Sequence, residues 1–293
     1  MYDIRPGAII NADCLTVLRQ MDAGSVDMVI TDPPYGVDYQ STRAAKENRK
    51  DKIAGDKRPF IWWIYDAYRV LKEGGGVLCF SRWDVQQTFI DALKIAGFSV
   101  KSVIVWDRVH HGMGDLKGSF APRYDTCIFA AKGRYILPNG RPDDVIQCQR
   151  LNGAELLHPN EKPAALMRQL VEATTKPGAL VLDPFAGSGS TLAAAALTGR
   201  QYIGVEIDPE YCRIAQKKVQ DALPRLQKNL PSDVKLGVIV DTSENILNTI
   251  DSLTETVLYA LLFVVIVVFL FLGRWRATLI ICITIPLSLI ASF

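Results

Sequence analysis

Short apolar runs alternate with segments whose apolar residues recur at helical spacing along the chain as far as Leu223. This alternation is typical of strands that are joined by helical crossovers. It predicts an α/β fold with a mostly parallel, Rossmann-like sheet and helices on both faces. Strands are predicted at residues 7–11, 26–30, 77–81, 99–106, 126–131, 179–182 and 202–206, and helices at residues 14–21, 60–71, 84–96, 164–175, 191–197 and 209–223.

Glycine, proline and a capping acid are expected to set several of these boundaries. The three glycines at 74–76 should separate the helix at 60–71 from the next strand, because glycine destabilises a helix interior. Pro224 should end the helix at 209–223, because proline lacks the N–H that the next turn would use. Asp13 is well placed to cap the first helix.

The C-terminal part of the chain has a different pattern. Residues 257–273 and 277–293 contain no charged residue, and an Arg-Trp-Arg tripeptide stands between them. Each stretch is at the short limit for a helix that spans a membrane, and a cytosolic helix this apolar on every side would have to be wholly buried. The pattern divides the chain into an α/β domain, residues 1–230, and a hydrophobic, transmembrane-like helical hairpin within residues 231–293.

Composition narrows the classes of function. The chain of 293 residues has a formal net charge of +2, and the part before residue 231 is the more basic, which is compatible with a polyanionic partner. The six cysteines are scattered without a Cys-x-x-Cys pair, which indicates reduced thiols in a cytosolic protein. The N-terminus lacks the pattern of a signal peptide. His110 and His111 lack the spacing of metal ligands, so no metal is expected.

Residues 31–36, Thr-Asp-Pro-Pro-Tyr-Gly, directly follow a predicted strand. An acid, two prolines and an aromatic residue thus stand where open α/β sheets place their ligand sites. Pro33 and Pro34 stiffen the turn and leave its carbonyls free to accept hydrogen bonds. With the carboxylate of Asp32 and the ring of Tyr35, these carbonyls form a predicted cradle for a planar group that bears an NH₂.

A second motif begins with Asp183, also directly after a predicted strand. A turn of small residues that includes Gly187 and Gly189 leads from it into an alanine-rich helix. Glycine allows a backbone to approach a ligand closely. Ser190 or Thr191 is expected to cap the helix.

An acid ends the next predicted strand as well. Glu206 comes about twenty residues after Asp183, which is the Rossmann arrangement for an adenosine whose ribose hydroxyls bind the acid. The glycines do not follow the dinucleotide spacing, and no Walker lysine follows them, so a bound pyrophosphate is not favoured.

The two motifs, Asp-Pro-Pro-Tyr at 32–35 and Asp-Pro-Phe-Ala-Gly-Ser-Gly-Ser at 183–190, resemble those of amino-group DNA methyltransferases that use S-adenosylmethionine. Their order is similar to that of the permuted β class, and so are Asn-Ala-Asp-Cys at 11–14 and His-Pro-Asn-Glu-Lys-Pro at 158–163. The resemblance covers about residues 7–223. It implies that S-adenosylmethionine is bound by Asp13, His158, Lys162, Asp183, Phe185, Gly187, Ser188, Gly189 and Glu206, and that catalysis uses Asp32, Pro33, Pro34 and Tyr35.

The implied reaction is direct, in-line methyl transfer to the exocyclic amino group of a base that is flipped out of DNA and stacked on Tyr35. Acceptors on both N–H bonds, Asp32 and the Pro33 carbonyl, favour a pyramidal nitrogen whose lone pair points at the methyl group. Adenine N6 is preferred, because an aspartate opens the motif, and cytosine N4 is the alternative. An RNA base or a protein amide presents a similar group, but enzymes for those substrates usually have the opposite motif order.

Double-stranded DNA is the expected partner. A polar segment after the catalytic motif is predicted either to close on phosphates or to be a solvated loop, and its basic residues include Arg43, Lys46, Arg49, Lys50 and Lys52. Residues 107–125 are predicted to form a loop over the DNA, and residues 134–157 a target-recognition segment. A cognate restriction enzyme is a further candidate partner, and both a monomer and a homodimer stay open.

Residues 231–293 resemble a piece of the resistance-nodulation-division efflux transporters. The proton-relay helix of those pumps is absent, so a working transporter is not implied. The positive-inside rule places Arg274 and Arg276 in the cytoplasm. The segment before residue 257, and with it the α/β domain, would then lie outside the cell, away from DNA and cofactor. The interpretation is a cytoplasmic methyltransferase that is joined near residues 229–232 to an unrelated fragment. A membrane-tethered methyltransferase is the alternative, and the tail would be its only contact with the membrane.

Overall fold

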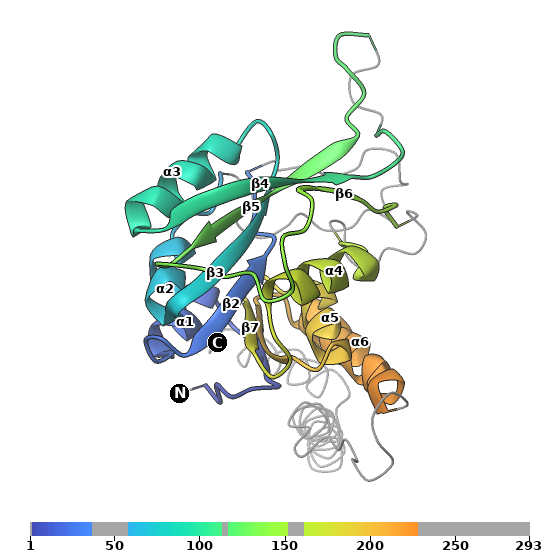
Figure 1. Cartoon of the computed structure of the whole chain (residues 1–293). Helices are drawn as coiled ribbons and strands as arrows, with labels where there is room; N and C mark the ends of the chain where they lie inside the picture. Colours follow the sequence, from blue (N-terminus) through green and yellow to red (C-terminus); the bar gives the residue numbers. More distant parts are fainter. Residues whose placement is uncertain (1, 37–57, 113–116, 152–160, 228–293) are drawn as a thin grey trace, which may run out of the picture. The chain divides into compact units, whose positions relative to one another are not determined.

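The computed structural model describes residues 2–36, 58–112, 117–151 and 161–227. In this part of the chain, the helices pack against one mixed sheet (Figure 1). Its strands lie in the order β1-β8-β7-β2-β3-β5-β4-β6. The bounds are β1 Ile9–Asn11, β2 Val26–Thr31, β3 Leu71–Ser81, β4 Ser99–Asp107, β5 Tyr124–Ala131, β6 Val145–Gln147, β7 Leu180–Asp183 and β8 Gln201–Glu206. Among these strands only β5 runs antiparallel to its neighbours, so the prediction of a mostly parallel α/β sheet is confirmed.

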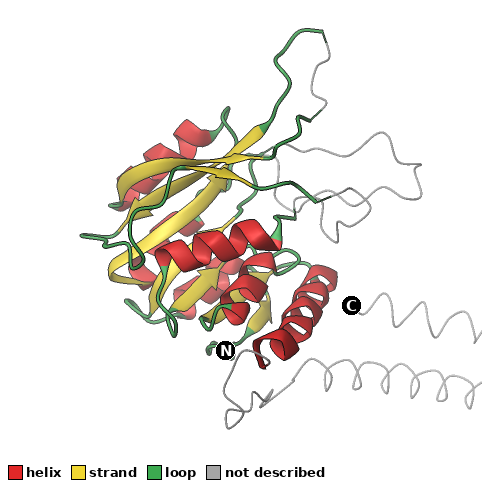
Figure 2. Ribbon diagram, turned by 45° about the vertical axis from the view of Figure 1, so that its right-hand side comes forward, coloured by secondary structure: helices red, strands yellow, loops and turns green. Residues whose placement is uncertain are grey.

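The helices cover both faces of the sheet, as predicted. Helices α1, α2 and α3 lie on one face, and α4, α5 and α6 lie on the other (Figures 1 and 2). Their bounds are α1 Cys14–Gln20, α2 Trp63–Val70, α3 Gln86–Ala96, α4 Ala164–Thr174, α5 Ser190–Leu197 and α6 Pro209–Gln227. The chain divides into two units, Met1–Lys235 and Leu236–Phe293, and every described element lies in the first.

The apolar core fills both interfaces between the sheet and its helices. Trp63 of α2, Phe80 of β3 and Phe89 of α3 are among the largest side chains that are fully buried. On the other face, α5 is buried from Ser190 to Ala196 because it contacts both α4 and α6. Its alanines explain the absence of an amphipathic pattern, since a helix that is enclosed on all sides is apolar all round.

The three glycines at 74–76 were predicted to precede a strand, but they lie inside β3. Backbone pairing with the segment after β5 holds them there: the Gly74 N–H donates to the Lys132 carbonyl over 2.9 Å, and the Lys132 N–H donates to Gly75 over 2.9 Å. A Cβ on Gly75 would lie 2.9 Å from the Asp27 carbonyl oxygen. The glycines therefore permit the close approach of two strands rather than interrupting one.

Two other local predictions are wrong, and one strand was missed. Helix α6 continues through Pro224 to Gln227, because the fixed φ of proline is itself helical and the chain can add a few residues after it. Gly189, not Ser190 or Thr191, is the N-cap of α5. The three-residue strand β6 was not predicted: it lies in the predicted target-recognition segment, residues 134–157, and its pairing with β4 determines its conformation. No helix in the described ranges is long and apolar enough to span a membrane. The predicted hairpin within 231–293 lies outside these ranges.

Candidate functional site

The two sequence motifs meet at the carboxyl edge of the sheet. Strands β2 and β7 are parallel neighbours, with Val29 opposite Leu182, so the residues that follow them emerge side by side. The hydroxyl of Thr31 at the end of β2 donates a hydrogen bond to the carboxylate of Asp183 at the end of β7. The structure thus joins segments that the sequence separates by about half of the chain.

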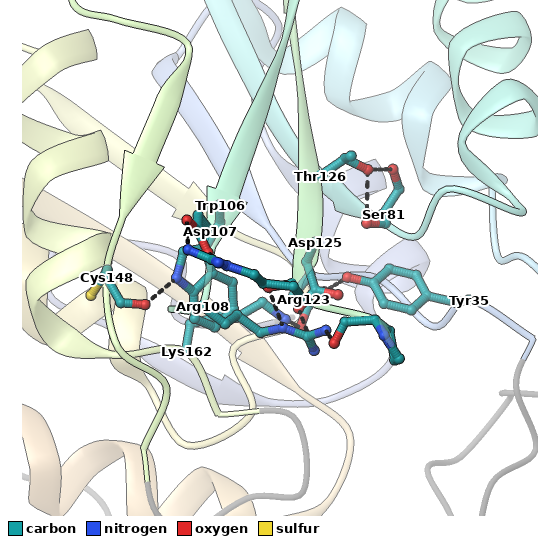
Figure 3. Close-up of polar contacts among 12 residues, drawn as sticks. Tyr35, Ser81, Trp106, Asp107, Arg108, Arg123, Asp125, Thr126, Cys148 and Lys162 are labelled. Carbon is teal, nitrogen blue, oxygen red and sulfur yellow. Dashed lines mark hydrogen bonds and ion pairs between the residues drawn. The ribbon is translucent and has the colours of Figure 1, made fainter. Parts of the chain in front are cut away.

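Asp32 is held at both of its carboxylate oxygens. The Tyr35 hydroxyl donates a hydrogen bond to Oδ1, and the Lys162 ammonium group donates to Oδ2 and forms an ion pair with it. The ammonium nitrogen also lies 5.0 Å from the centre of the Phe80 ring. Figure 3 shows Tyr35 and Lys162 in this region. Each carboxylate oxygen has two lone pairs, so Asp32 retains the capacity to accept hydrogen bonds from a ligand.

The turn that follows Asp32 is closely packed. The Phe60 N–H donates to the Pro34 carbonyl over 3.0 Å. Tyr35 is buried and packs edge-on against Phe89, with ring centres 6.4 Å apart. Burial, together with the neighbouring Asp32 carboxylate, raises the pKa of the Tyr35 hydroxyl well above its usual value. The hydroxyl is therefore a proton donor near neutral pH, while the role of the ring as a stacking surface stays a prediction.

Asp183 lies at the centre of the second motif and is buried. Its carboxylate accepts hydrogen bonds from the Thr31 hydroxyl and from the Phe185 N–H, 3.1 Å away. Removal from water raises the pKa of this carboxyl to about 6, although hydrogen bonds from Thr191 and Thr31 oppose the shift. Asp183 therefore stabilises the turn from inside. The hydrogen bonds described for its carboxylate are all to protein groups, so its contact with a cofactor stays a prediction.

Glu206, at the end of β8, faces the same turn. Its carboxylate accepts hydrogen bonds from the N–H groups of Gly187, over 2.8 Å, and of Asp208, over 2.9 Å. Burial raises the pKa of this carboxyl. The carboxylate is thus fixed in orientation, and its remaining lone pairs are suited to the hydroxyls of a ribose.

The segment from Asn11 to Asp13 lies beside Glu206, because β1 and β8 are neighbours. The Asn11 side chain donates to the carbonyls of Glu206 and Ile207 over 2.9 and 3.0 Å. Asp13 caps α1 as predicted, accepting a hydrogen bond from the Thr16 N–H over 3.1 Å. The Asp13 side chain is exposed, and it lies at the same end of the sheet as Glu206. Its predicted contact with the cofactor stays a prediction.

Packing within the protein accounts for some of the residues that were predicted to bind the cofactor. Gly187 and Gly189 both have a positive φ, which favours glycine. A Cβ on Gly189 would lie 2.8 Å from Cα of Ala215, so close packing against α6 already requires glycine there. Phe185 packs edge-on against Phe60 and Trp63, with ring centres 5.9 Å apart in each case. Ligand contacts of Gly189 and Phe185 stay predictions.

Lys218 of α6 belongs to this site, although its sequence context gave no signal for it. Its ammonium group forms an ion pair with Glu161 and donates to the hydroxyls of Ser188, over 3.1 Å, and Ser190, over 3.2 Å. Lys162, the next residue after Glu161, contacts Asp32 instead of the glycine turn. The sequence resemblance had placed Lys162 among the cofactor contacts.

A polar network holds the base of the hairpin that connects β4 with β5. Arg123 donates to both oxygens of Asp107, each over 2.7 Å, and holds the pKa of that carboxyl down at about 2 (Figure 3). Arg108 donates to the Pro122 carbonyl and pairs with Asp125. The charge of Asp125 contributes to the raised pKa of Tyr35, which relates this hairpin to the turn at residues 32–35. The hairpin projects beyond the sheet (Figure 1).

Some predicted site residues lie outside the described ranges. They are His158 of the predicted cofactor set and Arg43, Lys46, Arg49, Lys50 and Lys52 of the predicted DNA-binding set. Within the described ranges, no group of three or more His, Cys, Asp or Glu residues could hold a metal ion.

Family models match two parts of the chain. Residues 26–147 and 139–217 match a family model described as DNA methylase, and residues 195–293 match that of the AcrB/AcrD/AcrF family. The chain is 35% identical over 228 residues to YubD of Escherichia coli K12, which is described as a methylase, and this match spans 76% of the chain and 95% of YubD. It is 28% identical over 252 residues to the DNA adenine methyltransferase YhdJ of the same organism, spanning 73% of the chain and 83% of YhdJ.

Solved structures share the fold. The M1.HpyAVI–SAM complex matches with a TM-score of 0.56 and 24% identity, over 72% of this chain and 98% of that one. The cytosine-N4-specific PvuII DNA methyltransferase matches with a TM-score of 0.57 and 18% identity, over 77% of this chain and 94% of that one.

Proposed function

The chain belongs to the DNA methylase family of amino-group methyltransferases, and from this premise we propose that it methylates the N6 amino group of adenine in double-stranded DNA with S-adenosylmethionine as donor. The observation that carries the proposal is the position of Asp32. Asp32 directly follows Thr31 at the end of β2, whose hydroxyl binds Asp183 at the end of β7, and Glu206 ends β8, the next strand of the sheet. An acceptor for a base and an adenosine site therefore share one edge of the sheet.

The residues around the β7–α5 turn fit S-adenosylmethionine. Glu206 presents an oriented carboxylate for the ribose hydroxyls, and Gly187, with its positive φ, would let the backbone of the turn approach the ligand closely. Asp13, Asp183, Phe185, Ser188 and Gly189 complete the proposed cofactor set, together with His158. The bound cofactor supplies an electrophilic methyl group on a sulfonium centre. The M1.HpyAVI complex with SAM, which has the same fold, supports this choice of cofactor.

The catalytic turn positions the amino group. Asp32 and the Pro33 carbonyl accept its two N–H bonds, which turns the nitrogen lone pair toward the methyl group. A base in a duplex is out of reach, so it is flipped out and stacked on Tyr35. Alignment of the two reacting groups supplies much of the acceleration, because it replaces an encounter of separate molecules by one fixed geometry. After transfer, Asp32 is placed to receive the proton that the nitrogen releases.

Adenine is proposed as the target because the motif opens with Asp32 and because the relative YhdJ is named a DNA adenine methyltransferase. Cytosine N4 is the second candidate, since the PvuII enzyme with the same fold is specific for it. Methylation of RNA or of a protein amide is a third and weaker candidate.

DNA contacts are proposed for two parts of the chain. The basic set Arg43, Lys46, Arg49, Lys50 and Lys52 would neutralise phosphates. The hairpin between β4 and β5 would lie over the duplex, and the network of Arg123 and Asp107 would keep its base in place. A restriction enzyme as partner and the choice between monomer and homodimer are open parts of the proposal.

The tail is proposed to be a separate, fused fragment. Residues 1–230 form the methyltransferase, which would act in the cytoplasm, where DNA and S-adenosylmethionine occur together. The match of residues 195–293 to the AcrB/AcrD/AcrF family supports an origin of residues 231–293 in an efflux transporter. Any membrane contact would come from this tail.

The test is a product analysis. Purified protein is incubated with S-adenosylmethionine carrying a labelled methyl group and with unmethylated duplex DNA, RNA or protein, and the labelled product is hydrolysed and identified. The proposal expects N6-methyladenine from DNA, and none from an Asp32→Ala variant. N4-methylcytosine would select the second candidate, and label in RNA or protein only would select the third.

A further inference from the structure

Two consecutive residues, Glu161 and Lys162, form ion pairs with opposite sides of the site. Lys162 binds Asp32 at the end of β2, and Glu161 binds Lys218 on α6. On the basis of the proposed function, we propose that Lys162 is a positioning residue that fixes the catalytic carboxylate, and that Glu161 and Lys218 tie it to the glycine turn.

The contacts of Lys162 restrict the orientation of the Asp32 carboxylate. The exposed fractions of the two side chains are only 11% and 19%, so their attraction is weakly screened by water. The ammonium group also lies over the Phe80 ring, and a cation is attracted to the face of such a ring. Since Tyr35 occupies the second carboxylate oxygen, rotation of the Asp32 carboxylate would break a contact in either direction.

The same dipeptide reaches the proposed cofactor turn. The Glu161 side chain is 6% exposed, and its partner Lys218 also binds the hydroxyls of Ser188 and Ser190. Ser188 lies in the turn, and Ser190 is the first residue of α5. A buried ion pair is costly to break on one side only, because the remaining charge stays buried without a partner. A displacement of the turn is therefore transmitted through Lys218 and Glu161 to Lys162.

This arrangement assigns Lys162 a different role from that implied by the sequence resemblance. A cofactor ligand contributes mainly to the affinity for S-adenosylmethionine. A positioning residue contributes to the rate of methyl transfer at saturating cofactor and DNA, because it determines the geometry of the acceptor rather than the binding of either substrate. The two roles are separable by experiment.

The experiment compares Lys162→Met, Lys162→Arg and the control Arg168→Met in the full chain. Arg168 lies on α4 and pairs with the exposed Glu172, so its replacement removes an equivalent charge from the surface. Single-turnover methyl transfer to DNA is measured at saturating cofactor, along with S-adenosylmethionine affinity by calorimetry and thermal stability. For Lys162→Met the proposal expects a rate about 100-fold lower, the loss associated with a misplacement of about 1 Å, with unchanged cofactor affinity. Lys162→Arg should recover part of the rate, and Arg168→Met should match the wild type.

Three results would overturn the positioning role. They are an unchanged rate in Lys162→Met, a loss of cofactor affinity as large as the loss of rate, and a Lys162→Arg variant that is folded but no faster than Lys162→Met. If Lys162→Met fails to fold, the Lys162→Arg variant decides alone: it must transfer methyl groups with wild-type cofactor affinity and an altered rate. Absence of transfer by the wild type would instead contradict the proposed function.

A second arm tests the connection to the turn. Lys218→Met and Glu161→Gln should each slow transfer, and combining either with Lys162→Met should add little further loss, because the residues act as one unit. Independent, multiplicative effects on the rate would show that Lys162 acts without Glu161 and Lys218.

Discussion

The hydroxyl of Thr31 donates a hydrogen bond of 2.9 Å to the buried carboxylate of Asp183, although 152 residues separate the two in the chain. The bond joins the end of β2 to the end of β7 and so fixes the turn at residues 32–35 against the β7–α5 turn. The order in which the two motifs occur in the chain is irrelevant to this contact, because it depends only on which strands are neighbours.

Asp183 makes the stability of the domain depend on pH. Its pKa is raised from 3.8 to about 6 by burial, so between these values the folded protein binds more protons than the unfolded chain. Burying the ionised carboxylate therefore lowers the free energy of unfolding by its full amount above pH about 6. This loss of stability disappears below the unfolded pKa of 3.8, where the carboxyl is protonated in both states. Replacement by the uncharged Asn, which has the same shape, should stabilise the domain at pH 7.5 by up to about 3 kcal/mol.

Denaturant unfolding of the wild type and of Asp183→Asn at several pH values tests this. The stability difference should shrink as the pH falls from 6 toward 4, since the other groups titrate equally in both proteins. A difference that widened over this interval would mean that the pKa of Asp183 is lowered in the fold.

Asp32→Ala should abolish methyl transfer and leave the affinity for S-adenosylmethionine unchanged, because Asp32 faces the base in the proposed complex. It should also reduce stability by about 3–5 kcal/mol, since the mostly buried Lys162 loses its charged partner. Asp32→Asn keeps the shape and one acceptor oxygen and is the matched control for the loss of charge. Single-turnover kinetics and calorimetry separate these effects, and loss of cofactor binding by a folded Asp32→Ala protein would contradict the assigned role.

Glu206→Ala should weaken S-adenosylmethionine binding by about 1.5–3 kcal/mol, the contribution of hydrogen bonds to a charged group. Calorimetric titration measures this directly. Glu210→Ala is the control, because Glu210 lies four residues further on, is exposed and pairs only locally with Arg213 among the contacts described. Equal cofactor affinities in the wild type and Glu206→Ala would place the ribose elsewhere.

Gly189→Ala should destabilise the domain more than Gly199→Ala. Both glycines have a positive φ, of 78° and 72°, so both substitutions strain the backbone by about 1–2 kcal/mol. Only at Gly189 would the new Cβ also lie 2.8 Å from Cα of Ala215, which adds about 1–3 kcal/mol of overpacking. Chemical denaturation of the two variants gives the comparison, and equal losses would show that α6 moves aside without cost.

A chain that ends at residue 230 should fold, stay in solution and methylate DNA. The described elements end with α6 at Gln227, and both motifs precede it. Removing the two uncharged stretches at 257–273 and 277–293 should also reduce aggregation, since large apolar patches drive association. Specific activity of the truncated protein, compared with that of the full chain in detergent, is the measurement. An inactive or unfolded truncation would make the tail part of the enzyme.

The sequence by itself determined the α/β class, the positions of most elements and the residues of the two motifs. These follow from local properties: the spacing of apolar residues in one element, and the composition of the turn that follows a strand. Asp32 at the end of β2 and Glu206 at the end of β8 are cases in which a local pattern was sufficient.

Only the tertiary structure decided which of these local features meet. The neighbours of β2 are set by packing across the whole sheet, so the contact of Thr31 with Asp183 has no local signature. The same holds for Lys162 on Asp32 and for Lys218 beside Ser188, because an ion pair between distant segments leaves no periodic pattern in either. The glycines at 74–76 show the converse: their local preference favours a break, but the bonds of Gly74 and Gly75 to Lys132 and the pairing of Gly76 on both sides outweigh it and extend β3 through them.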